Sequence, residues 1–226
     1  SFPTRRSSDL IKKYFPSVNH DILKTIIRKK IKDKRLLCLL DEIIDSAPGI
    51  PIGNYLSQYF SNLYLTYYDH WLKEEKKVKH YLRYADDMVI LSTDKEYLHK
   101  LLVDIKEYLW TNLKLEVKGN HQVFPVASSR YDKHGRAIDF VGVKIFRKQI
   151  LIRKCIKKNF AREAHILNIS DKMLYNFYRR HISAWLGWVK YTNGNNLAKK
   201  LIKPEYYNKL KIIFHKKSYK WRTVKK

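Results

Sequence analysis

Two adjacent acids, Asp86 and Asp87, are the residues of this chain best placed to carry chemistry, because they interrupt two apolar runs. The runs at residues 81–84 and 88–91 are rich in aromatic, aliphatic and β-branched side chains, which predicts two short strands joined by a tight turn. Neighbouring carboxylates at such a turn would suit Mg²⁺, which prefers oxygen ligands and often binds only one or two carboxylates, with water and substrate phosphates completing its shell. Two such ions can stabilise both the attacking and the leaving oxygen of a phosphoryl transfer.

A solvated turn is the alternative interpretation of the same pair. Turns select Asp because its short side chain bonds to nearby backbone, and an Asp-Asp pair in a hairpin is more often a turn than a metal site. Residues 84–87 taken alone therefore leave both interpretations open, and the rest of the chain has to separate them.

The composition favours a polyanion as partner. The chain has 226 residues, 45% hydrophobic and 14% aromatic, enough for one large domain or two small ones with a real core. It carries 47 Lys and Arg against 21 acids, a formal net charge of +26, which is more than solubility requires. Nucleic acid is the natural partner. A membrane is a weaker candidate, because no apolar run approaches the roughly 18 residues of a spanning helix.

The two cysteines, Cys38 and Cys155, lie far apart and form no CxxC or Cys/His cluster. Neither a disulfide framework nor a zinc site is predicted, and a reducing cytoplasm is the expected location.

The beginning of the chain looks foreign to the rest of it. Residues 1–9 resemble the translation of a common sequencing adapter. Residues 1–10 are therefore expected to be a non-native segment and are excluded from the expected fold. The native reading frame would then begin near Leu10 or Ile11.

Apolar spacing predicts the elements that must position the acidic pair. Residues 19–44 carry apolar side chains at helical spacing, as one helix or as two broken near residues 32–34, with N-cap chemistry from Asn19 and Asp21. The Pro- and Gly-rich residues 48–53 cannot continue a helix, and a helical stripe resumes after them.

The second half of the chain is expected to mix one long helix, short strands and a basic helical end. Thr93 and Glu96 predict a capping box before a helix across residues 98–109. Beyond Arg153 the chain becomes helical and basic. Three short strands are expected between these helical parts, at residues 122–126, 138–146 and 149–152.

Five segments resemble, in order and spacing, successive palm motifs of reverse transcriptases: residues 11–17, 49–58, 84–87, 122–126 and 139–142. Residues 185–188 resemble part of the thumb of these enzymes. The resemblance implies an α+β fold, a polymerase right-hand palm of antiparallel sheet with packed helices, followed by a helical thumb. The palm with partial fingers would span residues 11–152 and the thumb residues 153–226, with the fingers largely missing.

The resemblance implies an RNA-directed DNA polymerase that acts by two-metal nucleotidyl transfer, with two Mg²⁺ ions as cofactors. Its partners would be template RNA, a DNA primer or cDNA, and deoxynucleotides. The loop motif at residues 52–58 is most similar to that of diversity-generating retroelements of bacteria or phages, which make adenine-mutagenised cDNA. Reverse transcriptases of these elements work with a small basic accessory protein, and the resemblance implies such a partner for this chain. No membrane partner is expected.

The resemblance also implies roles for single residues. Asp86 would be the principal magnesium ligand and Asp87 a ligand of lesser or indirect role. Lys118 matches a lysine that donates a proton to pyrophosphate. Phe15 matches the aromatic residue that closes off space at the sugar 2′ position, and a simple core aromatic is its alternative.

Two further groups complete the expected site. The residues expected to contact the nucleotide are Ile52, Gly53, Ser57 and Gln58. At Ile52 an apolar residue replaces a polar Gln, which the resemblance implicates in loose base selection; an ordinary loop hydrophobe is the alternative. The residues that resemble the primer grip are Phe140, Val141 and Gly142.

The chain departs from the family pattern at the first catalytic carboxylate. Where the family has Asp directly before the residue matching Ile11, this chain has Leu10, and Asp9 lies one residue too early. A one-residue slip in a strand turns a side chain to the opposite face. We therefore expect the chain to bind nucleic acid but to polymerise poorly or not at all.

Two other hypotheses remain open. One is a reverse transcriptase of the phage-defence or group II intron type, although Ser57 and Gln58 argue against the intron type. The other is a non-catalytic RNA-binding remnant that acts through its +26 charge.

Overall fold

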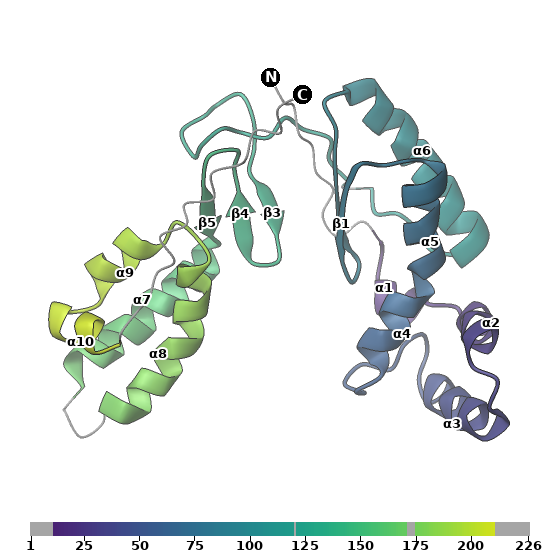
Figure 1. Cartoon of the computed structure of the whole chain (residues 1–226), viewed down its shortest axis with the longest axis horizontal. Coiled ribbons are helices and arrows are strands. Elements are labelled where there is room, and N and C mark those ends of the chain that lie inside the picture. Colours follow the sequence, from purple (N-terminus) through teal and green to yellow (C-terminus); the bar gives the residue numbers. More distant parts are fainter. Residues whose placement is uncertain (1–10, 120, 171–174, 211–226) are drawn as a thin grey trace. The chain divides into compact units, whose positions relative to one another are not determined.

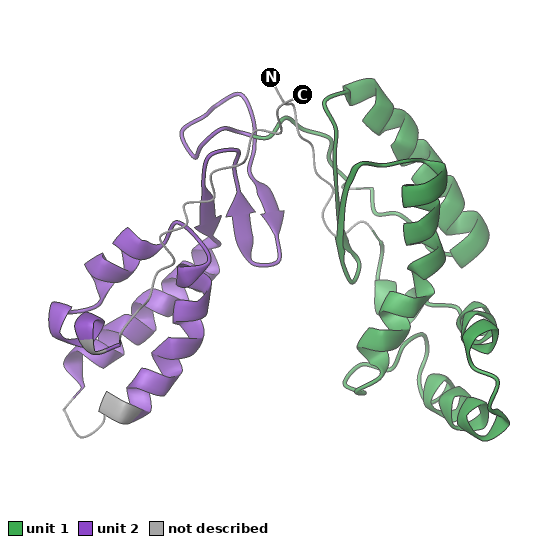
Figure 2. Ribbon diagram, viewed as in Figure 1, with its two compact units in different colours: residues 1–126 green, residues 127–226 purple. Residues whose placement is uncertain are grey.

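The computed structural model describes residues 11–119, 121–170 and 175–210. It is 55% helical with small antiparallel sheets, in agreement with the α+β class expected from the sequence. The chain divides into two compact units, residues 1–126 and residues 127–226 (Figure 2), and each is described by itself. None of the helices within the described ranges has the length and hydrophobicity that crossing a bilayer requires.

In unit 1, helices precede and follow a two-stranded hairpin (Figure 1). Its elements are α1 (Tyr14–Ser17), α2 (His20–Lys30), α3 (Lys34–Asp45), α4 (Ser57–Tyr64), α5 (Thr66–His70), the π-helical turn η1 (Trp71–Glu75), β1 (His80–Tyr84), β2 (Asp87–Leu91) and α6 (Lys95–Leu113).

Polar caps separate α2 from α3. The Asn19 carboxamide oxygen accepts a hydrogen bond from the Ile22 amide at 3.0 Å and begins α2, as its sequence position indicates. The Asp33 carboxylate accepts from the Leu36 amide at 2.8 Å and begins α3. Of the two interpretations left open for residues 19–44, the broken pair of helices is the one observed.

The cap of α6 lies one residue later than expected. The prediction of a capping box at Thr93 is wrong, because Asp94 is the N-cap and its carboxylate accepts from the amides of Glu96 at 2.8 Å and Tyr97 at 3.1 Å. A negatively charged cap satisfies two free amides and also interacts favourably with the positive end of the helix dipole, which a Thr hydroxyl cannot do.

An aromatic cluster anchors the hairpin of unit 1 to its helices. The Trp71 and Tyr108 rings stack with centroids 4.4 Å apart, and Tyr68 contacts both of them. Tyr81 of β1 packs edge-on against Tyr68 at 6.3 Å. Because aromatic pairs add to the stability that comes from burial alone, this cluster fixes β1 against α5 and α6.

Unit 2 joins a small sheet to a bundle of helices. Its elements are β3 (Ile138–Phe140), β4 (Val143–Ile145), β5 (Ile150–Ile152), α7 (Lys154–Ile169), α8 (Tyr175–Lys190), α9 (Asn195–Leu201) and α10 (Pro204–Lys209). The sheet is antiparallel in the order β3-β4-β5. The helices bury their own apolar core, which includes Phe160, Leu167, Ile182 and Val189.

Two of the three expected strands differ from the observed ones. Residues 122–125 form no strand. The strand expected at residues 138–146 is instead a hairpin, which turns at Val141 and Gly142 with φ angles of 42° and 79°. The apolar pattern hides this turn, because Val is disfavoured at positive φ and does not signal a two-residue turn as Asn-Gly does. The third strand, expected at residues 149–152, is confirmed as β5.

The unit boundary lies before the sheet, whereas the palm-and-thumb expectation places a boundary at residue 152. Backbone and side-chain bonds join β5 to the end of α8: the Ile150 amide donates to the Asn193 carboxamide at 2.7 Å, and the Asn193 amide donates to the Ile150 carbonyl at 2.8 Å. The β3–β4 turn packs against Trp188, which lies 2.7 Å from where a Cβ on Gly142 would stand. The three-stranded sheet and the helices that follow it in sequence therefore form one compact unit.

Candidate active site

The acidic pair stands at the turn of the hairpin formed by β1 and β2, as the sequence predicts. Tyr84 pairs with Asp87, which leaves Ala85 and Asp86 as a two-residue turn. Ala85 has a φ of 50°, the positive value that the first position of a tight hairpin turn adopts. Both carboxylates are half-buried, while the two residues after them, Met88 and Val89, are buried. Burial of Met88 and Val89 in β2 thus fixes the turn, and the turn leaves the two carboxylates partly exposed to solvent.

Arg83 holds the turn against α4 and α5. Its guanidinium donates to both carboxylate oxygens of Asp69, at 2.9 Å and 2.5 Å, and to the carboxamide oxygen of Asn62 at 3.0 Å. It also donates to the carbonyl of Ala85 in the turn itself at 3.1 Å. The Tyr81 hydroxyl donates to Asp69 at 2.8 Å. This network ties the position of Asp86 to two helices.

The Arg83 side chain is only 11% exposed, so its charge state depends on its partner. Burial lowers the pKa of the Arg83 guanidinium, but the hydrogen bond and charge of Asp69 more than offset this, and the net shift is upward. Arg83 therefore stays charged and forms a buried, bidentate pair with Asp69.

Tyr14 of α1 lies within electrostatic reach of Asp86. Its hydroxyl donates to the Ser61 carbonyl of α4 at 2.6 Å. Burial raises the pKa of the Tyr14 hydroxyl, and the negative charge of Asp86 acts in the same direction. Tyr14 thus stays neutral and adds no negative charge beside the acids. Phe15, its neighbour in sequence, is half-buried and packs edge-on against Tyr14 at 5.6 Å.

The loop at residues 48–58 is pinned to α1 and α2. The Ile50 amide donates to the Phe15 carbonyl at 2.8 Å, and a ring nitrogen of His20 lies 2.7 Å from the Gly49 carbonyl. The structure therefore brings this loop beside Phe15.

Within that loop the expected nucleotide contacts divide into exposed and buried residues. Ile52 is 84% exposed, and Gly53 and Gln58 are exposed with it. Ser57 is buried, and its hydroxyl donates to the Pro51 carbonyl, so this side chain holds the loop together rather than facing solvent.

Gly49 should be the most sensitive glycine of this loop. It has a φ of 69°, and a Cβ there would lie 2.2 Å from the Phe15 carbonyl oxygen, whereas Gly53 has a φ of 91° and nothing within 4 Å. We expect Gly49→Ala to lower the free energy of unfolding by about 2 kcal/mol and Gly53→Ala by about 1 kcal/mol, since only the first adds a clash to backbone strain. Urea denaturation followed by circular dichroism measures both. Equal losses would show that the close approach at Gly49 has no energetic weight.

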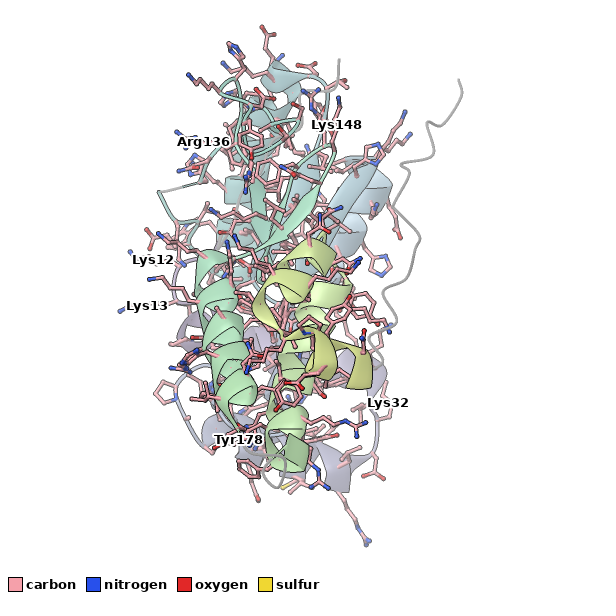
Figure 3. All side chains as sticks on the ribbon, turned by 90° about the vertical axis from the view of Figure 1, so that its left-hand side faces the viewer. Lys12, Lys13, Lys32, Arg136, Lys148 and Tyr178 are labelled. Atoms are coloured by element: carbon pink, nitrogen blue, oxygen red, sulfur yellow. The ribbon has the colours of Figure 1, made fainter. Side chains whose placement is uncertain are left out.

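Lys118 lies next to the segment that begins the first motif. Ile11 and Val117 form an isolated antiparallel bridge, and the Lys12 amide donates to the Glu116 carbonyl at 2.9 Å. The ammonium of Lys12 also pairs with the Glu116 carboxylate at 2.9 Å. Lys12 extends outward from the chain (Figure 3) and is about half exposed. Residues 11–17 and Lys118 therefore belong to the same side of unit 1.

The three primer-grip candidates lie in unit 2, at and beside the turn between β3 and β4. Phe140 ends β3, and Val141 and Gly142 form the turn itself. Val141 is a β-branched residue at positive φ, a conformation that persists only where the surroundings enforce it. The Arg153 amide donates to the Gly142 carbonyl at 3.0 Å and supplies part of that constraint.

The residues present at the hairpin are compatible with a magnesium ion. Asp86 forms no hydrogen bond or ion pair with any described residue, so its carboxylate is available to a cation. Its neighbour Asp87 does interact with another residue. No three His, Cys, Asp or Glu within the described ranges gather closely enough to form a metal site. Asp9 and Leu10, where the family has its first carboxylate, lie outside those ranges.

Sequence reasoning missed three residues that build the site: Asp69, Arg83 and Tyr14. Arg83 offered a signal, because a lone cation inside an apolar strand requires a buried partner. Asp69 offered none, since it continues an ordinary helical polar face. Comparison of the chain with known protein families and with curated proteins found no match.

Proposed function

We propose that this chain is an RNA-directed DNA polymerase. One observation carries the proposal: the Asp86–Asp87 turn is fixed by Arg83 beside Tyr14, and the loop at residues 48–58 is bonded to Phe15 next door. Three segments far apart in sequence are thus linked to one another, and Tyr14 in one of them lies within electrostatic reach of the half-exposed Asp86. A solvated turn needs none of these constraints, and a site for a triphosphate and a primer end needs all of them.

Each residue would have a distinct role. Bound Mg²⁺ would activate the primer 3′-hydroxyl and neutralise the charge that develops on pyrophosphate. Asp86 would hold the metal, because its carboxylate has no competing bond to any residue that the structure describes. Phe15, fixed against Tyr14, would exclude a 2′-hydroxyl by steric contact. Lys118 would donate a proton to the leaving pyrophosphate.

The retroelement subtype rests on the loop. Ile52 is 84% exposed and offers a neighbouring base an apolar contact with no hydrogen bond. A site without such a bond discriminates weakly between bases, because the wrong base leaves no polar group unpaired. Weak discrimination of this kind is what mutagenic cDNA synthesis requires. A pair of near-identical repeats beside the gene, differing chiefly at adenines, would support the subtype.

Primer extension on an RNA template tests the polymerase activity. We expect the chain to give weak, magnesium-dependent extension and Asp86→Asn to reduce it to the level without enzyme, since the carboxylate charge is lost without a change of shape. Asp87→Asn should reduce it less. Unchanged extension in Asp86→Asn would contradict the proposal.

A non-catalytic RNA-binding protein is the second candidate function. It is favoured by the net charge of +26 and by Leu10 in place of the first carboxylate. The two functions predict opposite results for the cellular activity of Asp86→Asn and Asp87→Asn combined, because a pure binder would keep that activity and a polymerase would lose it.

A further inference from the structure

A basic loop outside every motif described above forms a rigid part of unit 2. Residues 127–137 are closed by backbone bonds from the Ala127 amide to the Arg136 carbonyl at 2.9 Å and from the Arg147 amide to the Ala127 carbonyl at 3.0 Å. The Lys148 amide donates to the Ser128 carbonyl at 3.0 Å. These bonds place residues 147 and 148 beside the loop, and we name the whole group, residues 127–137 with 147 and 148, the basic loop.

Asp132 is the internal anchor of the basic loop. Its carboxylate accepts from the Ser128 amide at 2.7 Å, the Ser128 hydroxyl at 2.9 Å and the His134 amide at 2.9 Å. The Ser128 and His134 amides and then the Ser128 hydroxyl lower the pKa of the Asp132 carboxyl to about 2. The anchor is therefore ionised at any working pH and holds the loop through three hydrogen bonds.

The outer surface of the basic loop is strongly cationic. Asp132 is the one acid in residues 127–137, and its oxygens accept hydrogen bonds from within the loop, while the Arg147 guanidinium lies 4.0 Å from one of them. The exposed basic side chains are Arg130, Lys133, Arg136, Arg147 and Lys148, with His134 beside them. Arg136 and Lys148 lie toward the same end of the unit (Figure 3). A rigid loop with clustered cations favours a polyanion, because little side-chain and backbone entropy is lost on binding.

An exposed aromatic residue distinguishes this surface from a general positive patch. Tyr131 is 74% exposed, and the Arg130 guanidinium lies over its ring, 4.5 Å from the centroid. The arginine orients the ring and leaves most of its surface open to solvent. A ring held in this way is a stacking platform for a nucleobase, and a base can reach it only when the strand is single.

We propose that the basic loop binds single-stranded RNA, with its cations on the phosphates and Tyr131 stacked on a base. The inference rests on the proposed function and deepens it, because it identifies a contact for the template strand in unit 2, among residues outside the acidic hairpin. An acidic protein surface would satisfy the cations equally, but it would leave the exposed ring without a planar partner. The two occupants therefore differ in what they require of Tyr131.

Binding to a fluorescently labelled RNA of about 20 nucleotides without secondary structure tests the proposal, by anisotropy on the whole chain. The assay contains EDTA and the chain carries Asp86→Asn, so that its outcome does not depend on catalysis. We expect Arg130→Glu, Lys133→Glu and Lys148→Glu combined to weaken binding about 30-fold and to reduce the slope of log affinity against log salt by about 2, at about 0.7 per lost contact.

A matched variant controls for net charge. Lys199→Glu, Lys200→Glu and Lys203→Glu change the same number of exposed lysines or arginines in the same unit and should weaken binding less than about 3-fold. Equal weakening by both triple variants would overturn the proposal, because the affinity would then follow net charge alone.

Tyr131 separates RNA from an acidic protein partner. Tyr131→Ala should weaken RNA binding about 10-fold, the usual value of one stacked base, and Tyr131→Phe should leave it unchanged. Polyglutamate should fail to displace the RNA at equal charge concentration. Full affinity in Tyr131→Ala together with displacement by polyglutamate would overturn the proposal in favour of an acidic protein surface.

Discussion

Leu10→Asp should raise the rate of magnesium-dependent primer extension about 100-fold, the effect that one preorganised electrostatic group typically has on a rate. The substitution restores a carboxylate directly before Ile11, the position at which the reverse transcriptase pattern has its first acid. By the resemblance to that pattern, a carboxylate at position 10 would join Asp86 and Asp87 as a ligand of the metal that positions the primer end and the triphosphate. Single-turnover extension of a DNA primer on an RNA template measures the rate.

Leu10→Asn is the control for this prediction. It has nearly the same shape as Asp but no charge, so it should leave the rate unchanged. Leu10→Asp combined with Asp86→Asn should return to the rate of the unmodified chain or below it, because both carboxylates are needed at once. A rate in Leu10→Asp equal to that of Leu10→Asn would mean that position 10 does not contribute to the site.

Arg83→Ala should lower the free energy of unfolding of unit 1 by about 4 kcal/mol, within the range for breaking one side of a buried ion pair. The substitution leaves the Asp69 carboxylate without its bidentate partner and frees the carbonyl of Ala85 and the carboxamide oxygen of Asn62. Urea denaturation with circular dichroism gives the value. The Asp86 turn should loosen as well, seen as faster hydrogen exchange of the hairpin amides.

An exposed pair in the same unit is the matched control for that loss. Arg28 pairs with Asp41 at 2.5 Å, but its side chain is 45% exposed, against 11% for Arg83. Arg28→Ala should therefore cost less than about 1 kcal/mol, because solvent screens an exposed pair. Similar losses in the two variants would contradict the role given to burial. A double-mutant cycle with Asp69→Asn isolates the coupling of the buried pair.

The local features of the fold could be predicted because they depend on neighbours in sequence. The hairpin at Asp86 and Asp87, the break at residues 48–53 and the cap at Asn19 all follow from turn chemistry, proline and periodicity. The wrong predictions also concerned local features, namely a helix cap and a tight turn. Asp94 replaced Thr93 as a cap because a carboxylate binds two amides, and the Val141 turn was hidden because Val is disfavoured there.

The sequence by itself determined that two carboxylates stand at a hairpin turn in a strongly basic chain. Only the tertiary structure decided what surrounds them: Arg83 bonds to Asp69 fourteen residues away, and Tyr14 bonds to Ser61 forty-seven residues away. The physical reason is that a turn or a cap depends on bonds within four or five residues, whereas a buried charge obtains its partner from whichever element packs against it.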